Sequence, residues 1–320
     1  MSAGVEPAPL LIGNAPISYG LFAATAGGEG IKPAAMLSEL ARAGYLGCEL
    51  GPPGCFGTPQ QVAESFAVAG LSALGAYVPI HFTSDDATVA SDLAGLRVSA
   101  AELSACGGGL LILADEGSPA LLQAPAHDPD DPALTLDAAG WSRLVQITAE
   151  ASRIAADHGL EVSFHPHIST YIEHPREIEL LLERTAVMLT LDTGHLLLAG
   201  GDPVTYLRRW RERINHVHLK DVRTEVLAAA KSAGRTDFDL WWESVCVPFG
   251  TGDVDLRGFI AELLGGGYER WLVVEQDRGP STVAEYPLIA AQQRANLEFV
   301  AAAASTLGSA YGRPSITIED

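Results

Sequence analysis

The sequence predicts an α/β protein of one domain, a (β/α)8 TIM barrel in which eight parallel strands alternate with helices. Two observations predict this class. Apolar runs rich in Val, Ile and Leu alternate with segments of helical periodicity along the chain, which is the pattern of a parallel sheet covered by helices. Eight such runs occur within about 300 residues, and this suits a single barrel better than two separate domains.

The expected strands are short apolar runs, each followed by a helical segment. In chain order they cover residues 10–17 (LLIGNAPI), 47–51 (GCELG), 74–82 (LGAYVPIHF), 109–115 (GLLILAD), 160–167 (LEVSFHPH), 187–195 (VMLTLDTGH), 214–222 (INHVHLKDV) and 271–277 (WLVVEQD). The fifth strand must stop near His165, because Pro166 has no N–H to donate within a central sheet. The histidines on either side of this proline therefore lie at a strand end.

The helices are expected between these runs, in segments such as AAMLSELARAG, WSRLVQITAEASRIAADHG and REIELLLERTA. Thr58-Pro59 and Asp202-Pro203 mark two helix starts, since each places a capping oxygen before a proline at the first helical position. No repeat or linker interrupts the pattern. We expect one domain over residues 1–320, with the barrel at about 10–305.

Two segments break the alternation of strand and helix. Residues 115–137 are rich in Pro, Asp and Ala, and residues 222–248 carry the stretch KSAGRTDFDLWWESV. Both follow a strand, and the loops that follow strands lie on the catalytic face of such a barrel. They are candidates for a lid over a substrate, although the first fits a solvated insertion equally well.

The composition bounds the partners of the chain. It has 320 residues, 48% of them hydrophobic, and a formal net charge of -20 from 20 Lys plus Arg against 40 Asp plus Glu. Such a surface repels polyanions, so we expect neither nucleic acid nor membrane as a partner. No signal-like or membrane-spanning stretch stands out, and the four cysteines show no CxxC spacing, which favours a cytoplasmic protein with reduced thiols. The sequence does not decide whether the chain forms homo-oligomers.

Metal-ligating residue types gather at the ends of the predicted strands. Asp192 and Glu275 end apolar runs, where an unpaired buried carboxylate is costly. Residues two apart in a strand face the same way, which lets neighbouring histidines point inward together. Imidazole and carboxylate suit a first-row divalent metal, so we predict one such ion at the barrel mouth: manganese or cobalt first, with zinc, iron or magnesium as alternatives. Five of the nine histidines occur at the ends of three consecutive predicted strands: His165, His167, His195, His216 and His218.

Other side chains could line the same mouth. His81 ends the third run and fits a core position as well as a substrate contact. Trp241 and Trp242, in the second long segment, could cover a polar ring or anchor that loop in the core. A structural role is expected for three histidines in loops or at helix ends: His127, His158 and His174.

Four motifs resemble those of the sugar phosphate isomerase/epimerase superfamily, the xylose isomerase-like TIM barrels. They are DTGH (192–195), HVHLKD (216–221), FGTGDVDL (249–256) and WLVVEQD (271–277). The likeness runs from about residue 10 to residue 300. Within the superfamily the sequence looks closest to the inosose dehydratase group, for which NAPIS (14–18), the FHPH run and HVHLKDV are typical.

The resemblance implies a set of metal ligands. Members of the superfamily usually hold one divalent metal with Glu, Asp, His and Glu from four strand ends. Asp192, His218 and Glu275 match the last three positions, whereas the SFHPH run has no acid at the first. Either His165 or His167 then replaces a glutamate, and we favour His165.

The missing glutamate has a chemical consequence. Epimerases of the superfamily use two bases on opposite faces of the substrate, usually the two glutamate ligands, and only Glu275 remains here. The resemblance therefore implies a carbon–oxygen lyase that dehydrates a polyhydroxylated keto-cyclitol (2-keto-myo-inositol, or scyllo-inosose). Glu275 or His195 would remove the α-proton, and Lys220 or His81 would protonate the departing β-hydroxyl. The residues expected to contact substrate are His167, His195, Lys220, Trp241 and Trp242.

Other activities fit parts of the same pattern. A 3-keto-glycoside or C-glycoside lyase would use the same metal and the same elimination with another leaving group. A keto-sugar isomerase or epimerase is the runner-up, weakened by the missing glutamate. An abasic-site endonuclease shares the barrel, but the net charge argues against it. A sugar-binding barrel without turnover is the alternative that is not an enzyme.

Overall fold

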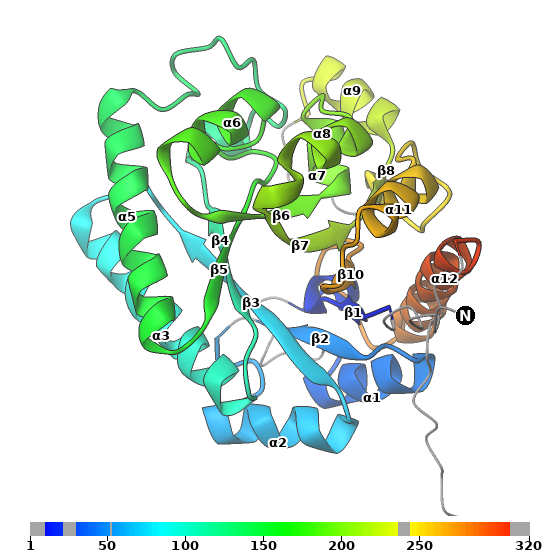
Figure 1. The fold of residues 1–320 in the computed structure, drawn as a ribbon. Coiled ribbons are helices and arrows are strands. Elements are labelled where there is room, and N and C mark those ends of the chain that lie inside the picture. Colours follow the sequence, from blue (N-terminus) through cyan, green and yellow to red (C-terminus); the bar gives the residue numbers. More distant parts are fainter. Residues whose placement is uncertain (1–9, 22–29, 52, 236–243, 308–320) are drawn as a thin grey trace, which may run out of the picture.

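The described part of the chain forms a closed barrel of eight parallel strands with helices around it (Figure 1). The structure is a computed structural model, and it describes residues 10–21, 30–51, 53–235 and 244–307. Around the barrel the strand order is β1-β10-β7-β6-β5-β4-β3-β2, so strands that follow one another in the barrel sequence are also neighbours in space. The predicted fold class is confirmed.

Each of the eight predicted runs contains one barrel strand. Strand β5 ends at His165, directly before Pro166, as the missing N–H of proline requires. His165 and Asp192 are the last residues of their strands, and Glu275 directly follows its strand. The strands are β1 (Ile12–Asn14), β2 (Gly47–Leu50), β3 (Ser72–Ile80), β4 (Leu110–Asp115), β5 (Glu161–His165), β6 (Met188–Asp192), β7 (Ile214–Leu219) and β10 (Leu272–Val274).

The longer helices cover the outside of the strands (Figure 1). Both helix starts read from the sequence are present. Thr58 caps its helix in a reciprocal capping box with Gln61, and the Asp202 side chain accepts a hydrogen bond from the Thr205 N–H. These helices are α1 (Pro33–Ala43), α2 (Pro59–Ala69), α3 (Asp86–Ala105), α5 (Ala138–Asp157), α6 (Pro175–Arg184), α8 (Pro203–Trp210), α11 (Leu256–Gly265) and α12 (Tyr286–Ser305). Further helices of the described chain are η1 (Pro16–Tyr19), α4 (Pro119–Leu122), α7 (Thr193–Leu198), η3 (Arg211–Arg213) and α9 (Thr224–Ser232).

Two glycines let neighbouring strands pack closely. A Cβ added at Gly13 of β1 would lie 2.1 Å from a side-chain carbon of Leu74, and one at Gly47 of β2 would lie 2.5 Å from another. Leu74, on β3, is 1% exposed. The missing side chains of β1 and β2 therefore leave the space that this leucine fills, and a larger residue at either glycine would force strand β3 outward.

The two segments predicted as long loops follow β4 and β7. The first, residues 115–137, contains the single helical turn α4. The second, residues 222–248, is more ordered than a simple loop: β8 (Asp221–Val222) pairs antiparallel with β9 (Cys246–Val247), and α9 lies between them. The stretch LAAAKS explains the helix, because leucine, alanine and lysine all favour it. Residues 236–243 of this segment lie outside the described residues.

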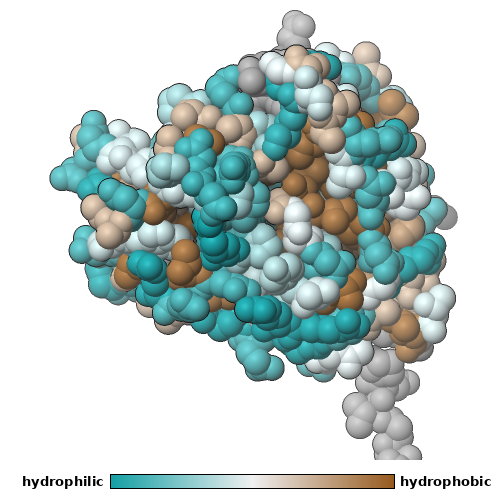
Figure 2. All heavy atoms as spheres, turned by 90° about the horizontal axis from the view of Figure 1, so that it is seen from above, coloured by the Kyte–Doolittle hydropathy of each residue, from teal (hydrophilic) through white to brown (hydrophobic). Residues whose placement is uncertain are grey.

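The surface is largely hydrophilic on the face that Figure 2 shows. Figure 2 shows one face of the molecule, where hydrophilic residues cover most of the area and apolar residues gather in separate patches between them. Among the described helices, none is both long enough and apolar enough to cross a membrane.

Candidate metal centre at the barrel mouth

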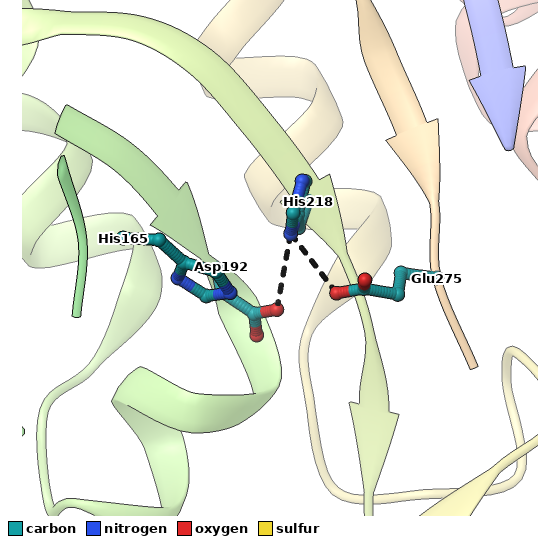
Figure 3. A group of neighbouring side chains, drawn as sticks. All are labelled: His165, Asp192, His218 and Glu275. Carbon is teal, nitrogen blue, oxygen red and sulfur yellow. Dashed lines mark ion pairs between the residues drawn. The ribbon is translucent and has the colours of Figure 1, made fainter. Parts of the chain in front are cut away.

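Four ionisable side chains converge at the carboxyl ends of four neighbouring strands (Figure 3). His165 ends β5, Asp192 ends β6, His218 lies in β7 and Glu275 directly follows β10. Their ligand-capable atoms lie within 4.8 Å of one another, and all four residues are buried. The strand register produces this arrangement, since Asp192 pairs with His218, and His218 pairs with Val273, two residues before Glu275. We call these four residues the mouth cluster.

His218 is central to the mouth cluster. Its Nδ1 lies 2.9 Å from Glu275 Oε2 and 3.8 Å from Asp192 Oδ2, the two contacts drawn as dashed lines in Figure 3. The His165 ring stands almost perpendicular to it, with ring centroids 4.9 Å apart. Burial alone would lower the pKa of His218, but Glu275 and Glu49 raise that pKa well above its ordinary value. The two carboxylates thus favour the protonated, positively charged form of the His218 ring.

Asp192 is fixed by the helix that begins at its own position. Its Oδ1 accepts hydrogen bonds from the backbone N–H groups of Gly194 and His195, both at 2.8 Å, so that it caps α7. The DTGH motif therefore orients the carboxylate through its own backbone, and Oδ2 remains directed at the mouth cluster. Burial raises the pKa of Asp192, whereas the nearby Lys220 opposes that rise.

The mouth cluster fits a divalent cation. Each of its members has one buried atom that makes no hydrogen bond to the described residues: His165 Nδ1, Asp192 Oδ2, His218 Nδ1 and Glu275 Oε2. Asp192 Oδ2 and Glu275 Oε2 also form ion pairs with Lys220 Nζ, and a cation among the four atoms would satisfy all of them. Two imidazoles and two carboxylates are donors that first-row divalent metals accept. His165, Asp192, His218 and Glu275 would hold such an ion.

Lys220 supplies a positive charge beside the mouth cluster. Its Nζ lies 3.1 Å from Asp192 Oδ2, 3.0 Å from Glu275 Oε2 and 2.8 Å from Asp277 Oδ2. Burial would lower the pKa of this ammonium group, but the three carboxylates, led by Asp192, raise it well above its ordinary value. Lys220 Nζ also lies 2.8 Å from His195 Nε2. Lys220 and His195, both expected from the sequence to contact substrate, therefore lie next to each other. Asp277 is a further member of this group that sequence reasoning missed.

His165 and His167 occupy different surroundings. His165 belongs to the mouth cluster, whereas His167 groups with His195 and Asp277. The His167 Nδ1 lies 2.8 Å from the Ile168 carbonyl oxygen, which accepts its proton, and its ring lies 3.9 Å from that of His195. Burial lowers the pKa of His165 well below its ordinary value and that of His167 to about 4. Both rings are therefore neutral, as a metal ligand or a proton acceptor must be.

A buried carboxylate from the opposite side of the barrel contacts the histidines of β7. Glu49 on β2 is 3% exposed, and its Oε1 lies 2.7 Å from His216 Nε2 and 2.8 Å from His218 Nε2. His216 points inward, as its spacing from His218 predicted, but its ring contacts Glu49 and is not part of the mouth cluster. Sequence reasoning did not single out Glu49.

His81 is not part of the mouth cluster, and two other residues proposed from the sequence fall outside the described chain. The His81 side chain is 44% exposed, and its Nδ1 lies 3.1 Å from Asp92 Oδ2 on α3. Within the described chain His81 belongs to none of the metal-competent groups, so its role as an acid stays a prediction. Trp241 and Trp242 lie outside the described residues.

A second group of buried polar residues joins three loops on the catalytic face. His174, just before α6, directs Nδ1 at the Ala199 carbonyl oxygen (2.9 Å) and Nε2 at that of His127 (2.7 Å). Carbonyl oxygens only accept, so both ring nitrogens must carry protons and the ring is a cation. Burial would lower the pKa of His174, but Glu173, 3.2 Å away, helps to raise it to about 9. The structural role predicted for His127 and His174 agrees with this arrangement.

This cation predicts a pH dependence of stability. Because the folded pKa of His174 lies above the ordinary value of about 6.5, its contribution should be complete below about pH 6.5 and lost as the pH rises through about 9. We expect His174→Gln to lower the free energy of unfolding at pH 6 by about 1–2 kcal/mol, allowing for partial solvent screening. Urea unfolding of both proteins at pH 6, 8 and 9.5 measures the difference. A difference that stayed constant across this range would contradict the assignment.

Comparisons with known proteins agree with this fold. Residues 28–300 match the family model described as "Xylose isomerase-like TIM barrel". An inosose dehydratase of Geobacillus kaustophilus (strain HTA426) is 30% identical over 285 residues, covering 87% of this chain and 91% of that protein. An inosose dehydratase of Geobacillus thermodenitrificans (strain NG80-2) is 29% identical over 263 residues, covering 80% of this chain and 86% of that protein. The resemblance read from the four motifs is confirmed.

Solved structures share the architecture at low sequence identity. The apo form of 3-keto-D-glucoside 4-epimerase, YcjR, from E. coli has a TM-score of 0.64 at 14% identity, covering 91% of this chain and 98% of that one. The IOLI protein "with a binding zinc atom" also has a TM-score of 0.64 at 14% identity, covering 96% of this chain and 100% of that one. At these identities the likeness concerns the fold alone.

Proposed function

Because this chain belongs to the xylose isomerase-like TIM barrel family, we propose that it is an enzyme that dehydrates a polyhydroxylated keto-cyclitol with the help of one divalent metal ion. The observation that carries the proposal is the mouth cluster, in which four buried donor atoms face a common point. The relatives named inosose dehydratase, which match most of the chain, support a carbon–oxygen lyase acting on a sugar-like ring.

The composition of the mouth cluster favours elimination over epimerisation. A two-base epimerisation needs a proton acceptor on each face of the substrate. In the cluster the carboxylates are Asp192, whose Oδ1 is held by the backbone of α7, and Glu275. His165 stands where the superfamily usually has a glutamate, so a neutral ring replaces a charged base. The exchange also removes one negative charge from the residues that would hold the ion.

The chain's own residues can divide the proton transfers between them. Burial would raise the pKa of Glu275, but His218 and Lys220 lower it well below its ordinary value, so that Glu275 is an ionised acceptor. The His195 ring is kept neutral by burial and is a second candidate base. Lys220, protonated and 2.8 Å from His195 Nε2, is the candidate donor.

In the proposed reaction the C–H bond next to the ketone breaks and its electrons form a carbon–carbon double bond. The β-hydroxyl leaves with a proton as water. When bound, the metal ion would polarise the ketone oxygen and stabilise the negative charge that develops there. The product is a diketone in its enol form.

The test is an anaerobic assay of metal-stripped protein with scyllo-inosose, to which manganese, cobalt, zinc or magnesium is added in turn. We expect a metal-dependent rise of the ultraviolet absorbance of a conjugated enol-ketone. A protein that rebinds metal but produces no such band would refute the keto-cyclitol assignment. Assays with 3-keto-glycosides and with epimerisable keto-sugars would then test the other activities that suit the same cluster.

The two histidines around Pro166 give a specific prediction about the ligands. His165→Ala should weaken Co²⁺ binding roughly 100-fold or more, because it removes one of four ligands. His167→Ala should leave the affinity within a few-fold of wild type, since its ring lies with His195 and Asp277. Competition with a chromophoric chelator measures both, and each variant serves as the control of the other. The reverse order of affinities would make His167 the ligand.

A further inference from the structure

Glu49 contacts the candidate metal ligand His218 at Nε2, whereas Asp192 and Glu275 lie on the side of Nδ1. We propose that Glu49 is a positioning residue that fixes the tautomer and the orientation of His218, so that Nδ1 is its ligand atom and the metal is held tightly. The inference rests on the proposed function, because it presumes that the mouth cluster holds a metal ion.

The hydrogen-bond pattern supports this assignment. One carboxylate oxygen, Glu49 Oε1, lies 2.7 Å from His216 Nε2 and 2.8 Å from His218 Nε2. A carboxylate oxygen accepts but does not donate, so both Nε2 atoms carry the proton. In the neutral ring, the form that can bind a metal, Nδ1 is then the nitrogen of His218 that carries the lone pair. It is also the nitrogen on the side of Asp192 and Glu275.

His216 holds the carboxylate in place. It lies two residues before His218 on the same strand, its side chain is fully buried, and the two ring centroids are 5.3 Å apart. Because His216 and His218 donate to the same oxygen, a swing of the Glu49 side chain would break two hydrogen bonds at once. His216 thus keeps Glu49 against His218, although it is not itself a member of the mouth cluster.

The charge of Glu49 adds to its geometric role. A carboxylate that accepts the outer N–H of a metal-bound histidine makes the other nitrogen more basic, and loss of such a partner typically lowers metal affinity 10–100-fold. Glutamine retains an oxygen acceptor but has no charge. Leucine removes both the acceptor and the charge, and would leave two buried N–H groups unsatisfied. The two substitutions therefore separate the effect of the charge from that of the hydrogen bond.

The experiment measures Co²⁺ affinity of the full-length protein by chelator competition, together with the visible absorption of the bound ion. We expect Glu49→Gln to weaken binding about 10–100-fold and Glu49→Leu to weaken it further. Glu102→Gln is the matched control: it removes another buried carboxylate, which accepts a backbone hydrogen bond from Gly54 and lies outside every metal-competent group of the described chain. Its affinity should equal that of wild type.

The outcomes separate this inference from the function on which it rests. Wild type that binds one Co²⁺ while Glu49→Gln binds it within twofold would overturn the role of Glu49 and leave the proposed function intact. Wild type that binds no ion would overturn both. Should Glu49→Leu fail to fold, the ¹⁵N spectrum of the histidine rings in metal-loaded wild type gives an independent reading. His218 should be protonated at Nε2 and ligated at Nδ1, and the opposite tautomer would refute the inference.

Discussion

Glu275→Gln is expected to lower kcat/KM for the keto-cyclitol by about 10²–10⁴, the usual contribution of a positioned acid or base. Glutamine has nearly the same shape and keeps one oxygen near His218, but it cannot accept a proton at neutral pH. The wild-type carboxylate is ionised, because His218 and Lys220 outweigh the effect of burial on its pKa. The change therefore removes a base and a negative charge from the mouth cluster with little change in volume.

The metal content of each protein must be measured together with its reaction rate. Initial rates with saturating Co²⁺ or Mn²⁺ should be compared at equal metal occupancy, so that a loss of affinity is not counted as a loss of chemistry. Glu161→Gln is a suitable control, since Glu161 begins β5, at the end of that strand away from His165, and pairs with Arg270. Full turnover of Glu275→Gln with metal bound would show that the base is another group, with His195 the next to test.

Lys220→Met is expected to lower the free energy of unfolding of the metal-free protein by about 3–5 kcal/mol, the usual cost of leaving buried charges without their partner. Lys220 is 1% exposed and lies within 3.1 Å of carboxylate oxygens of Asp192, Glu275 and Asp277. Methionine fills a similar volume without the charge. Three carboxylates would then share a buried site without the ammonium group between them.

Chemical unfolding in urea measures this effect, with the exposed Lys231→Met as the control. Two further results should accompany it. Burial raises the pKa of Asp277 to about 7 and also raises that of Asp192. The loss of unfolding free energy in Lys220→Met should therefore become smaller as the pH falls and these carboxylates become neutral. Added divalent metal should restore part of the stability, because a bound cation replaces the lost charge. An unfolding midpoint unchanged from wild type would mean that the carboxylates do not depend on Lys220.

The barrel could be predicted because its signal is repeated eight times. Each apolar run is followed by a helical segment. An error of a few residues in the end of one strand does not change the number of strands that the sequence predicts. Helix α9 shows where this reasoning stops. The sequence predicts a long loop over its segment, Thr224–Ser232, because residues 222–248 break the alternation of strand and helix. A short amphipathic helix that buries little more than Leu227 gives only a weak pattern.

The residues of the mouth cluster could be proposed because strand ends of a parallel barrel meet on one face. The sequence does not decide between His165 and His167, because both lie at the end of the same strand. The course of the backbone around Pro166 determines which ring enters the mouth cluster. Glu49 and Asp277 were missed for different reasons. Glu49 lies in GCELG, a run that gives no sign of which histidines it will meet 167 and 169 residues later. Asp277 lies two residues after Glu275, a spacing that favours the same side of the barrel. This spacing could have predicted its place beside Lys220.

If Glu49 positions His218 as inferred above, the bond between them implies an order of events for the newly made chain. All four members of the mouth cluster lie between residues 165 and 275, yet the carboxylate that orients one of them comes from β2, 169 residues before His218. A partly assembled chain would display the four donors with one ring still free to turn. Tight metal loading would then wait until the first strands have closed against the last. The affinity for the metal ion would then be high only in the completely folded barrel.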